Sequence, residues 1–478
     1  GKTEPSVTGT DSDYAMTSIL GRVNYAYADK YLFQFNIRRD GSSRFGKNYR
    51  YGTFPSFSLG WRMSEERFFT PVKNVIDDLK LRTSYGVIGD QQAIGDYDYA
   101  TYITVGEGAI FGPDQTFYPG AIQKGRANPN LRWEQKATFN IGVDFSMFDQ
   151  HFYGSVEYFN SKSKDLLVKL PISWTEGTDI TPWSNYGKLK NTGVEINLGY
   201  RETKRAFKYN IGLNLSHVKN EVLELGESFR EGGTNGVNRS EKGRSVGDFY
   251  VIKTNGIFQS WDEVYAHTTT VTENGQTITK LIQPDAHPGD IRYIDANNDG
   301  KIDKDDRQYV GSPLPKFEMG ITFSAEYKNF DFSLFMTGVF GNKIYNVGKY
   351  WLERMDETSN YPKDLKPWTE ENHSTTTPRP VIGTTDNTLA YTDRWIERGD
   401  YFRIKNLQVG YTFKDSWLKK TKFIGSARLY VSAQNLWTIT GYSGYDPEIS
   451  GGDVFGQGND NGHFPPVRTF SIGAQVSF

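Results

Sequence analysis

Residues 137–145 read ATFNIGVDF, and the alternation in this stretch decides the fold class. Successive side chains of an extended chain point to opposite faces, so one face carries Ala137, Phe139, Ile141, Val143 and Phe145. The opposite face carries Thr138, Asn140, Gly142 and Asp144. An alternation sustained for about nine to eleven residues is typical of a tilted strand that crosses a membrane. One face suits lipid and the other suits water.

The same period-two pattern predicts thirteen strands, and the connections between them alternate in length. The strands are expected near residues 16–28, 31–39, 55–63, 79–87, 136–145, 152–160, 192–200, 206–218, 319–327, 330–340, 402–413, 425–435 and 467–478. Short connections are expected at 29–30, 146–151, 201–205, 328–329 and 414–424, with a longer one at 64–78. Long connections are expected at 40–54, 88–135, 161–191, 219–318, 341–401 and 436–466. This asymmetry predicts an all-β fold, a transmembrane antiparallel β-barrel of the outer membrane with periplasmic turns and long extracellular loops.

Aromatic residues flank four of the short connections, as expected for the aromatic girdle of such a barrel. The pairs are Tyr27 with Tyr31, Phe145 with Phe152, Tyr200 with Phe207, and Tyr327 with Phe330. Strands favour aromatic residues in general, but the repetition at four turns favours a belt at one level. The last strand places an apolar residue at every second position and ends at Phe478. This ending resembles the outer-membrane assembly signal.

The composition excludes several classes of function. The 478 residues carry a net charge of −2, so a nucleic-acid partner is not expected. The absence of cysteine excludes disulfides, Cys-ligated zinc, iron–sulfur clusters and thiol catalysis. The sequence contains no run of about 18 apolar residues, so it predicts no membrane-spanning helix. The motifs HExxH, GxSxG and GxxxxGK[ST] are missing as well, and we predict that the protein is not an enzyme.

Thirteen is an odd number, whereas single-chain bacterial barrels close with an even number of strands. We therefore expect residues 1–478 to be the C-terminal portion of a longer barrel. Seven stretches, in order along the chain, resemble successive blocks of the SusC/RagA family of TonB-dependent outer-membrane transporters. They are FPSFSLGWRMSEERFF (54–69), NPNLRWEQKATFNIGVDFSMF (128–148), YFNSKSKDLL (158–167), NTGVEINLGY (191–200), GDIRYIDANNDGKIDKDDRQYVGSPLPKF (289–317), RWIERGDYFRIKNLQVGYTF (394–413) and ARLYVSAQNLWTITGYSGYDPEIS (427–450).

This resemblance implies a barrel of about 22 strands, with a plug domain and a TonB box before it that residues 1–478 lack. It implies import of an oligosaccharide or oligopeptide, driven through TonB–ExbB–ExbD, beneath a SusD-like surface lipoprotein that acts as a lid. It also implies contact with outer-membrane lipid, dimers of transporter–lid pairs and a Gram-negative host from the Bacteroidota. A passive porin and a soluble carbohydrate-binding β-protein stay open as alternatives, and metal chelates stay open as cargo.

Residues 295–306, DANNDGKIDKDD, follow the pattern of a calcium-binding loop. The expected ligands are the side chains of Asp295, Asn297, Asp299, Asp303 and Asp306 and the backbone carbonyl of Lys301. Two features depart from the pattern, because the last position is Asp rather than Glu and the preceding GDIRYI is extended rather than helical. The alternative is an Asp/Asn/Gly turn without a metal. We predict weak Ca²⁺ binding that stiffens the loop.

Tryptophans in the expected loops are candidates for stacking on sugar rings or peptide side chains. They are Trp174, Trp183, Trp261, Trp351 and Trp368. Loop packing or contact with a lid is the simpler explanation for any one of them. The sequence therefore identifies no individual substrate-binding residue.

Overall fold

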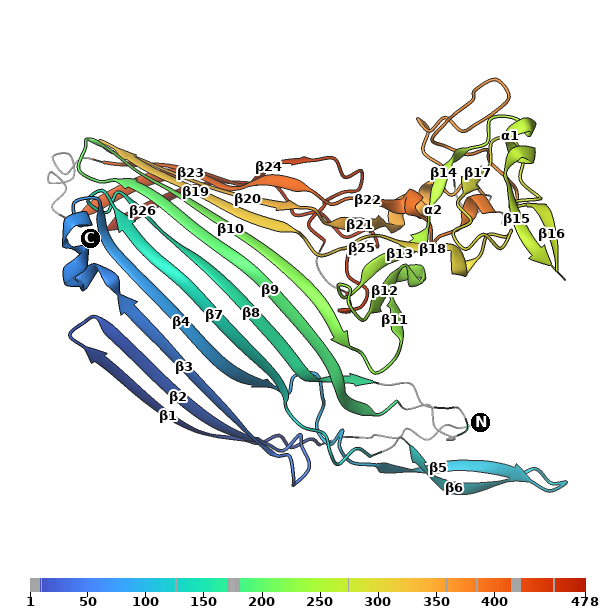
Figure 1. Ribbon diagram of the computed structural model, residues 1–478, viewed down its shortest axis with the longest axis horizontal. Coiled ribbons are helices and arrows are strands. Elements are labelled where there is room, and N and C mark those ends of the chain that lie inside the picture. The colour runs from blue at the N-terminus through green and yellow to red at the C-terminus, as the bar shows by residue number, and fades with distance from the viewer. Residues whose placement is uncertain are drawn as a thin grey trace. The chain divides into compact units, whose positions relative to one another are not determined.

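The main feature of the fold is a single antiparallel sheet of thirteen long strands (Figure 1). The computed structural model describes residues 9–478 except 10, 125–126, 170–172, 174, 176–180, 274, 357–359, 384–385, 414–422 and 450–451. The strands follow one another in the order β1 (Met16–Tyr27), β2 (Tyr31–Ser42), β3 (Tyr51–Arg62), β4 (Ile76–Asp90), β7 (Glu134–Met147), β8 (Phe152–Lys169), β9 (Trp183–Glu202), β10 (Phe207–Glu224), β19 (Phe317–Tyr327), β20 (Phe330–Phe340), β23 (Tyr401–Thr412), β24 (Ser426–Thr440) and β26 (Thr469–Ser477). None of the helices among the described residues is long and apolar enough to span a membrane.

All thirteen predicted strands are confirmed, and several are longer than the alternation indicated. β8 continues to Lys169 and β9 begins at Trp183, so both enter the stretch 161–191 that was expected to be a loop. The alternation of apolar and polar residues is weaker there because the face of β8 that carries Val156 and Tyr158 continues with the polar residues Asn160, Lys162 and Lys164. The predicted short connection 414–424 lies mostly outside the described residues.

The first compact unit comprises residues 1–194 and 220–228. Its strands pair antiparallel and in register, with Arg22 opposite Asn36 and Gly142 opposite Glu157. The apolar face of these strands is exposed, as Phe139 and Val156 show with 40% and 41% of their surface accessible. A hairpin of β5 (Tyr102–Phe111) and β6 (Thr116–Lys124) extends from the connection between β4 and β7 (Figure 1). Two short 3-10 helices, Met63–Glu65 and Arg67–Val72, form the connection between β3 and β4.

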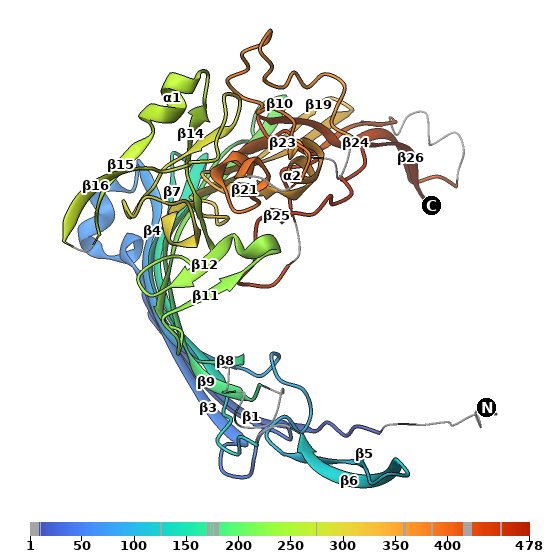
Figure 2. The ribbon, with the colours of Figure 1, turned by 90° about the vertical axis from the view of Figure 1, so that its right-hand side faces the viewer.

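The second compact unit comprises residues 195–219 and 229–478. Its long loops fold into small sheets around a buried core that includes Phe249, Tyr345 and Trp395. The sheets are formed by β11 (Phe229–Gly232), β12 (Asn238–Glu241), β13 (Asp248–Ile252) and β18 (Arg307–Gly311), by β14 (Thr254–Ile257) with β17 (Ile291–Tyr293), by β15 (Thr268–Glu273) with β16 (Gln276–Leu281), and by β21 (Lys343–Asn346), β22 (Ile396–Arg398) and β25 (Asn459–Asp460). The unit also contains two short α-helices, α1 (Trp261–Ala266) and α2 (Val347–Glu353) (Figure 2). Its described 3-10 helices are Thr234–Gly236, Lys304–Asp306, Asp386–Thr388 and Asp393–Trp395.

The aromatic residues at the short turns contact one another within each unit. In the first unit the rings of Tyr27 and Tyr31 lie 6.5 Å apart, and those of Phe145 and Phe152 lie 5.7 Å apart. In the second unit Tyr209 links Tyr200 to Phe207, Phe207 contacts Tyr327 at 6.3 Å, and Phe330 contacts Tyr411 at 4.9 Å. Two of the four predicted pairs, Tyr27 with Tyr31 and Phe145 with Phe152, are therefore in direct ring contact. The residues of the other two pairs contact further aromatic residues at the turn ends of the strands.

Candidate functional site

The polar face of the first unit carries a row of hydrogen bonds that crosses three strands. Arg22 on β1, Asn36 on β2 and Ser56 on β3 lie opposite one another in the register of the sheet. Arg22 donates from Nε to Oδ1 of Asn36 at 2.6 Å, and Asn36 donates from Nδ2 to Oγ of Ser56 at 3.2 Å. On β7 and β8, the hydroxyls of Thr138 and Ser161 share a hydrogen bond of 3.0 Å. Side-chain hydrogen bonds on this face thus link β1 to β3 and, separately, β7 to β8.

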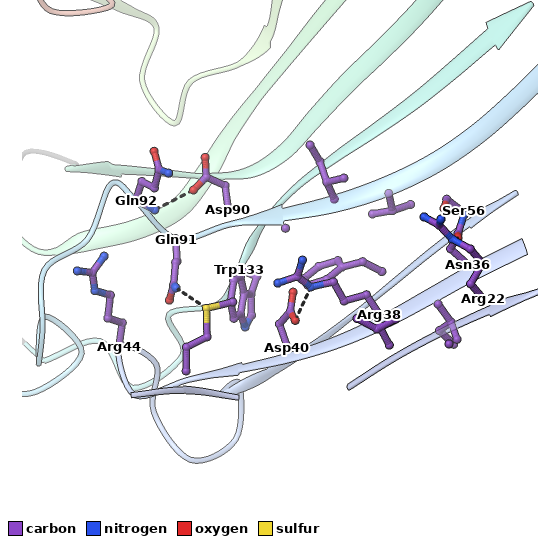
Figure 3. A pocket seen from close by; sticks show the side chains of 18 of the residues that line it. Arg22, Asn36, Arg38, Asp40, Arg44, Ser56, Asp90, Gln91, Gln92 and Trp133 are labelled. Carbon is purple, nitrogen blue, oxygen red and sulfur yellow. Dashed lines mark hydrogen bonds and ion pairs between the residues drawn. The ribbon is translucent and has the colours of Figure 1, made fainter. Parts of the chain in front are cut away.

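A cavity of about 720 Å³ opens on this polar face, where β1–β4 lead into the long loops (Figure 3). Arg38 lines it and donates from Nε to Oδ1 of Asp40 at 2.7 Å, while Asp40 itself is only 5% exposed. Arg44 reaches the cavity from the loop after β2 and is held by Asp96 at 3.0 Å. These ion pairs fix the side chains that form the wall.

The charges of the cavity largely cancel. Arg38 and Arg44 are paired with carboxylates, whereas Arg22 and Asp90 have no ion-pair partner among the described residues. The rest of the polar lining consists of amide and hydroxyl groups, such as those of Asn36 and Gln91. Among the described residues, the wall thus offers one cation and one anion outside ion pairs, together with many neutral donors and acceptors. Such a wall suits a ligand rich in hydroxyl or amide groups.

Aromatic side chains close one end of the cavity. Trp133 is 4% exposed, packs against Phe45 and Phe54 at ring distances of 5.1 and 5.6 Å, and donates from Nε1 to the carbonyl of Arg50 at 3.2 Å. A Cβ atom at Gly89 would lie 2.1 Å from Cζ of Phe54, so only glycine leaves room for that ring. This cluster anchors the loops around the cavity by ordinary core packing.

A second polar group lies nearer the turn end of the same face. Arg82 on β4 contacts Asp144 at 3.0 Å and reaches past Gly142 to Glu157 at 2.5 Å. A Cβ atom at Gly142 would lie 3.2 Å from Cζ of Arg82, so the absence of a side chain gives the guanidinium its path. Lys80 adds a further contact to Asp144 at 3.7 Å. Charge on this face is thus paired across three strands.

In the second unit, Arg403 on β23 holds the loop that follows β24. Its side chain is completely buried, and it contacts Asp446 at 2.5 Å, Glu448 at 2.7 Å and the hydroxyl of Thr438 at 2.8 Å. Lys405 contacts the same Glu448 carboxylate at 2.6 Å from a more exposed position. The buried guanidinium is therefore one of the groups that hold this loop, and the one that pairs with Asp446.

Glu397 on β22 joins the same loop to α2. Its carboxylate accepts hydrogen bonds from the amide of Ser443 at 2.9 Å, from the Ser443 hydroxyl at 2.7 Å and from Lys349 at 3.1 Å. Burial alone would raise the pKa of this carboxyl, but the hydrogen bonds from Ser443 and the charge of Lys349 outweigh it and lower the pKa. Glu397 is therefore held as an anion.

The residues predicted to bind calcium lie on one turn-rich loop. Carboxylate oxygens of Asp295 and Asp306 accept hydrogen bonds from backbone amides of that same loop. Asp295 accepts from the amides of Asp299 and Gly300 at 3.2 and 3.0 Å, and the fully buried Asp306 accepts from the amides of Ala296 and Asp303, both at 2.8 Å.

The side chain of Lys301 forms ion pairs with Asp299 and Asp303, while Asn297 donates to Asp299 at 3.1 Å. Within the part of the chain that the structure describes, no three His, Asp or Glu side chains gather as a metal site. An ammonium already occupies the space between two of the expected ligands. Ca²⁺ binding stays a prediction.

The candidate loop tryptophans have different environments. Trp261 and Trp351 are 46% and 47% exposed, whereas Trp368 is 8% exposed and donates to Oε1 of Gln259 at 3.2 Å. Trp183 begins β9 and packs against the cluster around Trp133. Trp174 lies outside the described residues. Trp368 and Trp183 are thus packing residues.

The cavity residues were not identified from the sequence. Alternation places Arg22, Asn36 and Arg38 on the polar face, but it places many other polar residues there too. The missing information was the register between strands, which brings Arg22, Asn36 and Ser56 together from three separate stretches. The signal that could have indicated the place is the density of arginine and aspartate at the end of β2, in IRRDGSSR.

Comparison with known proteins shows which family this chain is similar to. Residues 2–436 match the family described as TonB dependent receptor-like, β-barrel. The TonB-dependent receptor P3 of Formosa agariphila is 33% identical over 480 residues, which cover 97% of this chain and 45% of that protein. The TonB-dependent receptor SusC of Bacteroides thetaiotaomicron is 29% identical over 469 residues, which cover 97% of this chain and 44% of that protein. The chain spans about half the length of the curated relatives it matches.

A solved structure of the RagAB peptide importer in its closed-closed state is similar in fold. It aligns with a TM-score of 0.78 and 24% sequence identity, covering 97% of this chain and 48% of the RagAB chain. At this identity the likeness concerns the fold alone. It shows that the fold of this chain is similar to that of a solved protein.

Proposed function

Because the chain belongs to the TonB-dependent receptor-like β-barrel family, we propose that it takes part in the active import of a nutrient across the outer membrane. The family places the protein in the outer membrane, and its relatives come from Bacteroidota. The observation that carries the proposal is the two-faced sheet, with one face of exposed apolar side chains and one of paired polar side chains. A wall of this kind separates lipid from an aqueous path.

The cargo that fits the polar face best is an oligosaccharide or an oligopeptide. The cavity beside Arg22 and Asp90 offers amides, hydroxyls and one charge of each sign, and both kinds of chain present many hydroxyl or amide groups. RagAB is named as a peptide importer, which supports an oligopeptide as the cargo. The similarity to SusC supports nutrient uptake as the function. The cavity itself does not select between the two.

We also propose two protein partners for the transporter. A SusD-like surface lipoprotein would cover the end that carries the long loops, as the relation to SusC and RagAB suggests. The TonB–ExbB–ExbD complex would supply energy from the periplasmic side, as the family description suggests. A dimer of transporter–lid pairs is the assembly that we expect.

The test is made in the native bacterium with the gene deleted and then restored. Cells are grown with single oligosaccharides or oligopeptides as the limiting nutrient, and uptake of the responsive cargo is measured. We expect the deletion to abolish growth on one cargo class and the restored gene to recover it. Normal growth of the deletion strain on every cargo that the wild type uses would refute import as the function.

A pair of neighbouring variants then tests the cavity. Arg38 points to the polar face and lines the cavity, whereas Arg39 points to the apolar face and stacks on Tyr51 at 5.2 Å. We expect Arg38→Gln to reduce uptake and Arg39→Gln to leave it unchanged, provided that both variants reach the outer membrane in equal amounts. Equal uptake by the two variants would show that the cargo does not contact this cavity. It would not contradict import as the function of the protein.

A further inference from the structure

The polarity of the side chains on the lipid-facing side of β8 changes along the strand, toward the end that leads into the long loop. The side chains on that face, in order, are Val156, Tyr158, Asn160, Lys162 and Lys164. Val156 and Tyr158 are exposed apolar or amphipathic groups, with 41% and 42% of their surface accessible, and both lysines are exposed. Along the strand these side chains change from apolar to amphipathic to cationic. The membrane around a barrel changes in the same order, from hydrocarbon through the interface to the lipid headgroups.

The two lysines lie at the height where headgroups are expected. Lys162 is ten residues beyond Phe152, the aromatic residue at the turn end of the same strand. With a rise of about 3.3 Å per residue and a tilt of about 40°, ten residues span about 25 Å along the membrane normal. That distance equals the height of the apolar band of an outer-membrane barrel, roughly 25 Å. The lysines therefore begin where the hydrocarbon ends, on the side of the long loops.

Neither lysine has a carboxylate partner among the residues that the structure describes. Their cross-strand neighbours on β7 are the uncharged Ala137 and Gln135, and no ion pair of either lysine exists among the described residues. The next strand, β9, provides a contrast, because Lys188 forms an ion pair with Glu224, and Lys190 contacts Glu221 at 3.7 Å. Asn185 on β9 donates to the carbonyl of Asp165 on β8 at 2.8 Å, which places the two lysine pairs at similar heights. Among the described residues, the pair on β9 has carboxylate partners and the pair on β8 has none.

We propose that Lys162 and Lys164 form a binding site for the phosphate groups of an outer-leaflet glycolipid. The two ammonium groups stem from positions about 7 Å apart on one strand and face the lipid, so cargo on the polar face cannot reach them. An anionic headgroup at the rim of the apolar band is the partner whose charge and position both fit.

The experiment uses the intact transporter, extracted in mild detergent and placed in phosphatidylcholine nanodiscs. Lipid A is titrated into them, and the bound molecules are counted by native mass spectrometry. The variants are Lys162→Gln with Lys164→Gln, and the matched control Lys188→Gln with Lys190→Gln. Heat-modifiable migration on gels confirms that each variant is a folded barrel.

We expect the first double variant to bind lipid A about thirtyfold more weakly than the wild type, because each lysine at an anionic surface strengthens binding about fivefold. We expect the control to stay within about twofold of the wild type, because its lysines are already paired. Dephosphorylated lipid A, which keeps the acyl chains, should bind all three proteins equally weakly.

Three outcomes would overturn the proposal. They are unchanged lipid A binding by the first double variant, an equal loss in the control, and equal binding of phosphorylated and dephosphorylated lipid A by the wild type. Loss of a co-purifying protein instead of lipid A in the first double variant would assign the two lysines to a protein partner and would also refute it. The result is independent of nutrient import, because it rests on membrane location alone.

Discussion

Replacing Arg403 with methionine should release the loop that follows β24. The guanidinium is completely buried and contacts Asp446, Glu448 and Thr438 within 2.8 Å. Methionine is likewise unbranched, but it is shorter and carries no charge, so Asp446, whose side chain is only 15% exposed, would lose its cation. Glu448 would keep Lys405. The expected damage is therefore concentrated at Asp446.

The magnitude follows from burial. Removing one partner of a buried ion pair costs roughly 3–5 kcal/mol, because the remaining charge stays buried without compensation. The matched control is Lys405→Met, which removes a partly exposed contact to Glu448 and should cost about 0–1 kcal/mol. At about tenfold per 1.4 kcal/mol, 3 kcal/mol shifts the opening equilibrium of the loop by roughly 150-fold.

Hydrogen exchange followed by mass spectrometry measures this opening. The amide of Glu448 donates to Asp446 at 2.8 Å, and the amide of Ile449 donates to the carbonyl of Pro447 at 3.1 Å, so both report on the loop. In Arg403→Met we expect these amides to exchange about a hundredfold faster or more. In Lys405→Met their exchange should change less than about fivefold. Similar exchange in the two variants would refute the role assigned to the buried guanidinium.

Three further predictions concern other parts of the chain. Calcium titration followed by calorimetry should show weak binding to the wild type and none to Asp299→Ala; no difference between them would leave a metal-free turn. The lowered pKa of Glu397 means that its stabilisation is present above its ordinary value of 4.5 and is lost as the pH falls through the lower folded value. Acid should therefore lower the protection factor of the Ser443 amide, which is its intrinsic exchange rate divided by the observed rate at the same pH, in the wild type. In Glu397→Gln this protection factor should not change over the same pH range. Gly142→Val should push Arg82 away from Glu157 and lower the temperature at which the folded gel band disappears, whereas an unchanged temperature would show that the guanidinium has another path.

The long strands could be predicted because one property repeats over many residues. Each side chain in 137–145 faces either lipid or water, and the sequence records that choice at every position. The pattern is weaker at Lys162 and Lys164, where both faces of β8 are polar. The strand continues because backbone pairing with β7 persists to Lys164 opposite Gln135.

The site was less predictable because it depends on register and on loop folding. The row from Arg22 to Ser56 joins residues that are 34 positions apart, and no local pattern encodes that contact. The small sheets of the second unit were missed because strands such as β11 and β12 have four residues each. Trp368 was expected in a loop and is there, but only the folded structure shows that it is buried against Gln259.

The most direct test of the central claim is the energy dependence of uptake. Labelled cargo identified in the growth experiment is given to native cells, with and without a protonophore, and in a strain that lacks TonB. Active import predicts saturable accumulation that stops when the protonophore is added or TonB is missing. Uptake that rises linearly with concentration and continues without TonB would show a passive pore and contradict the account.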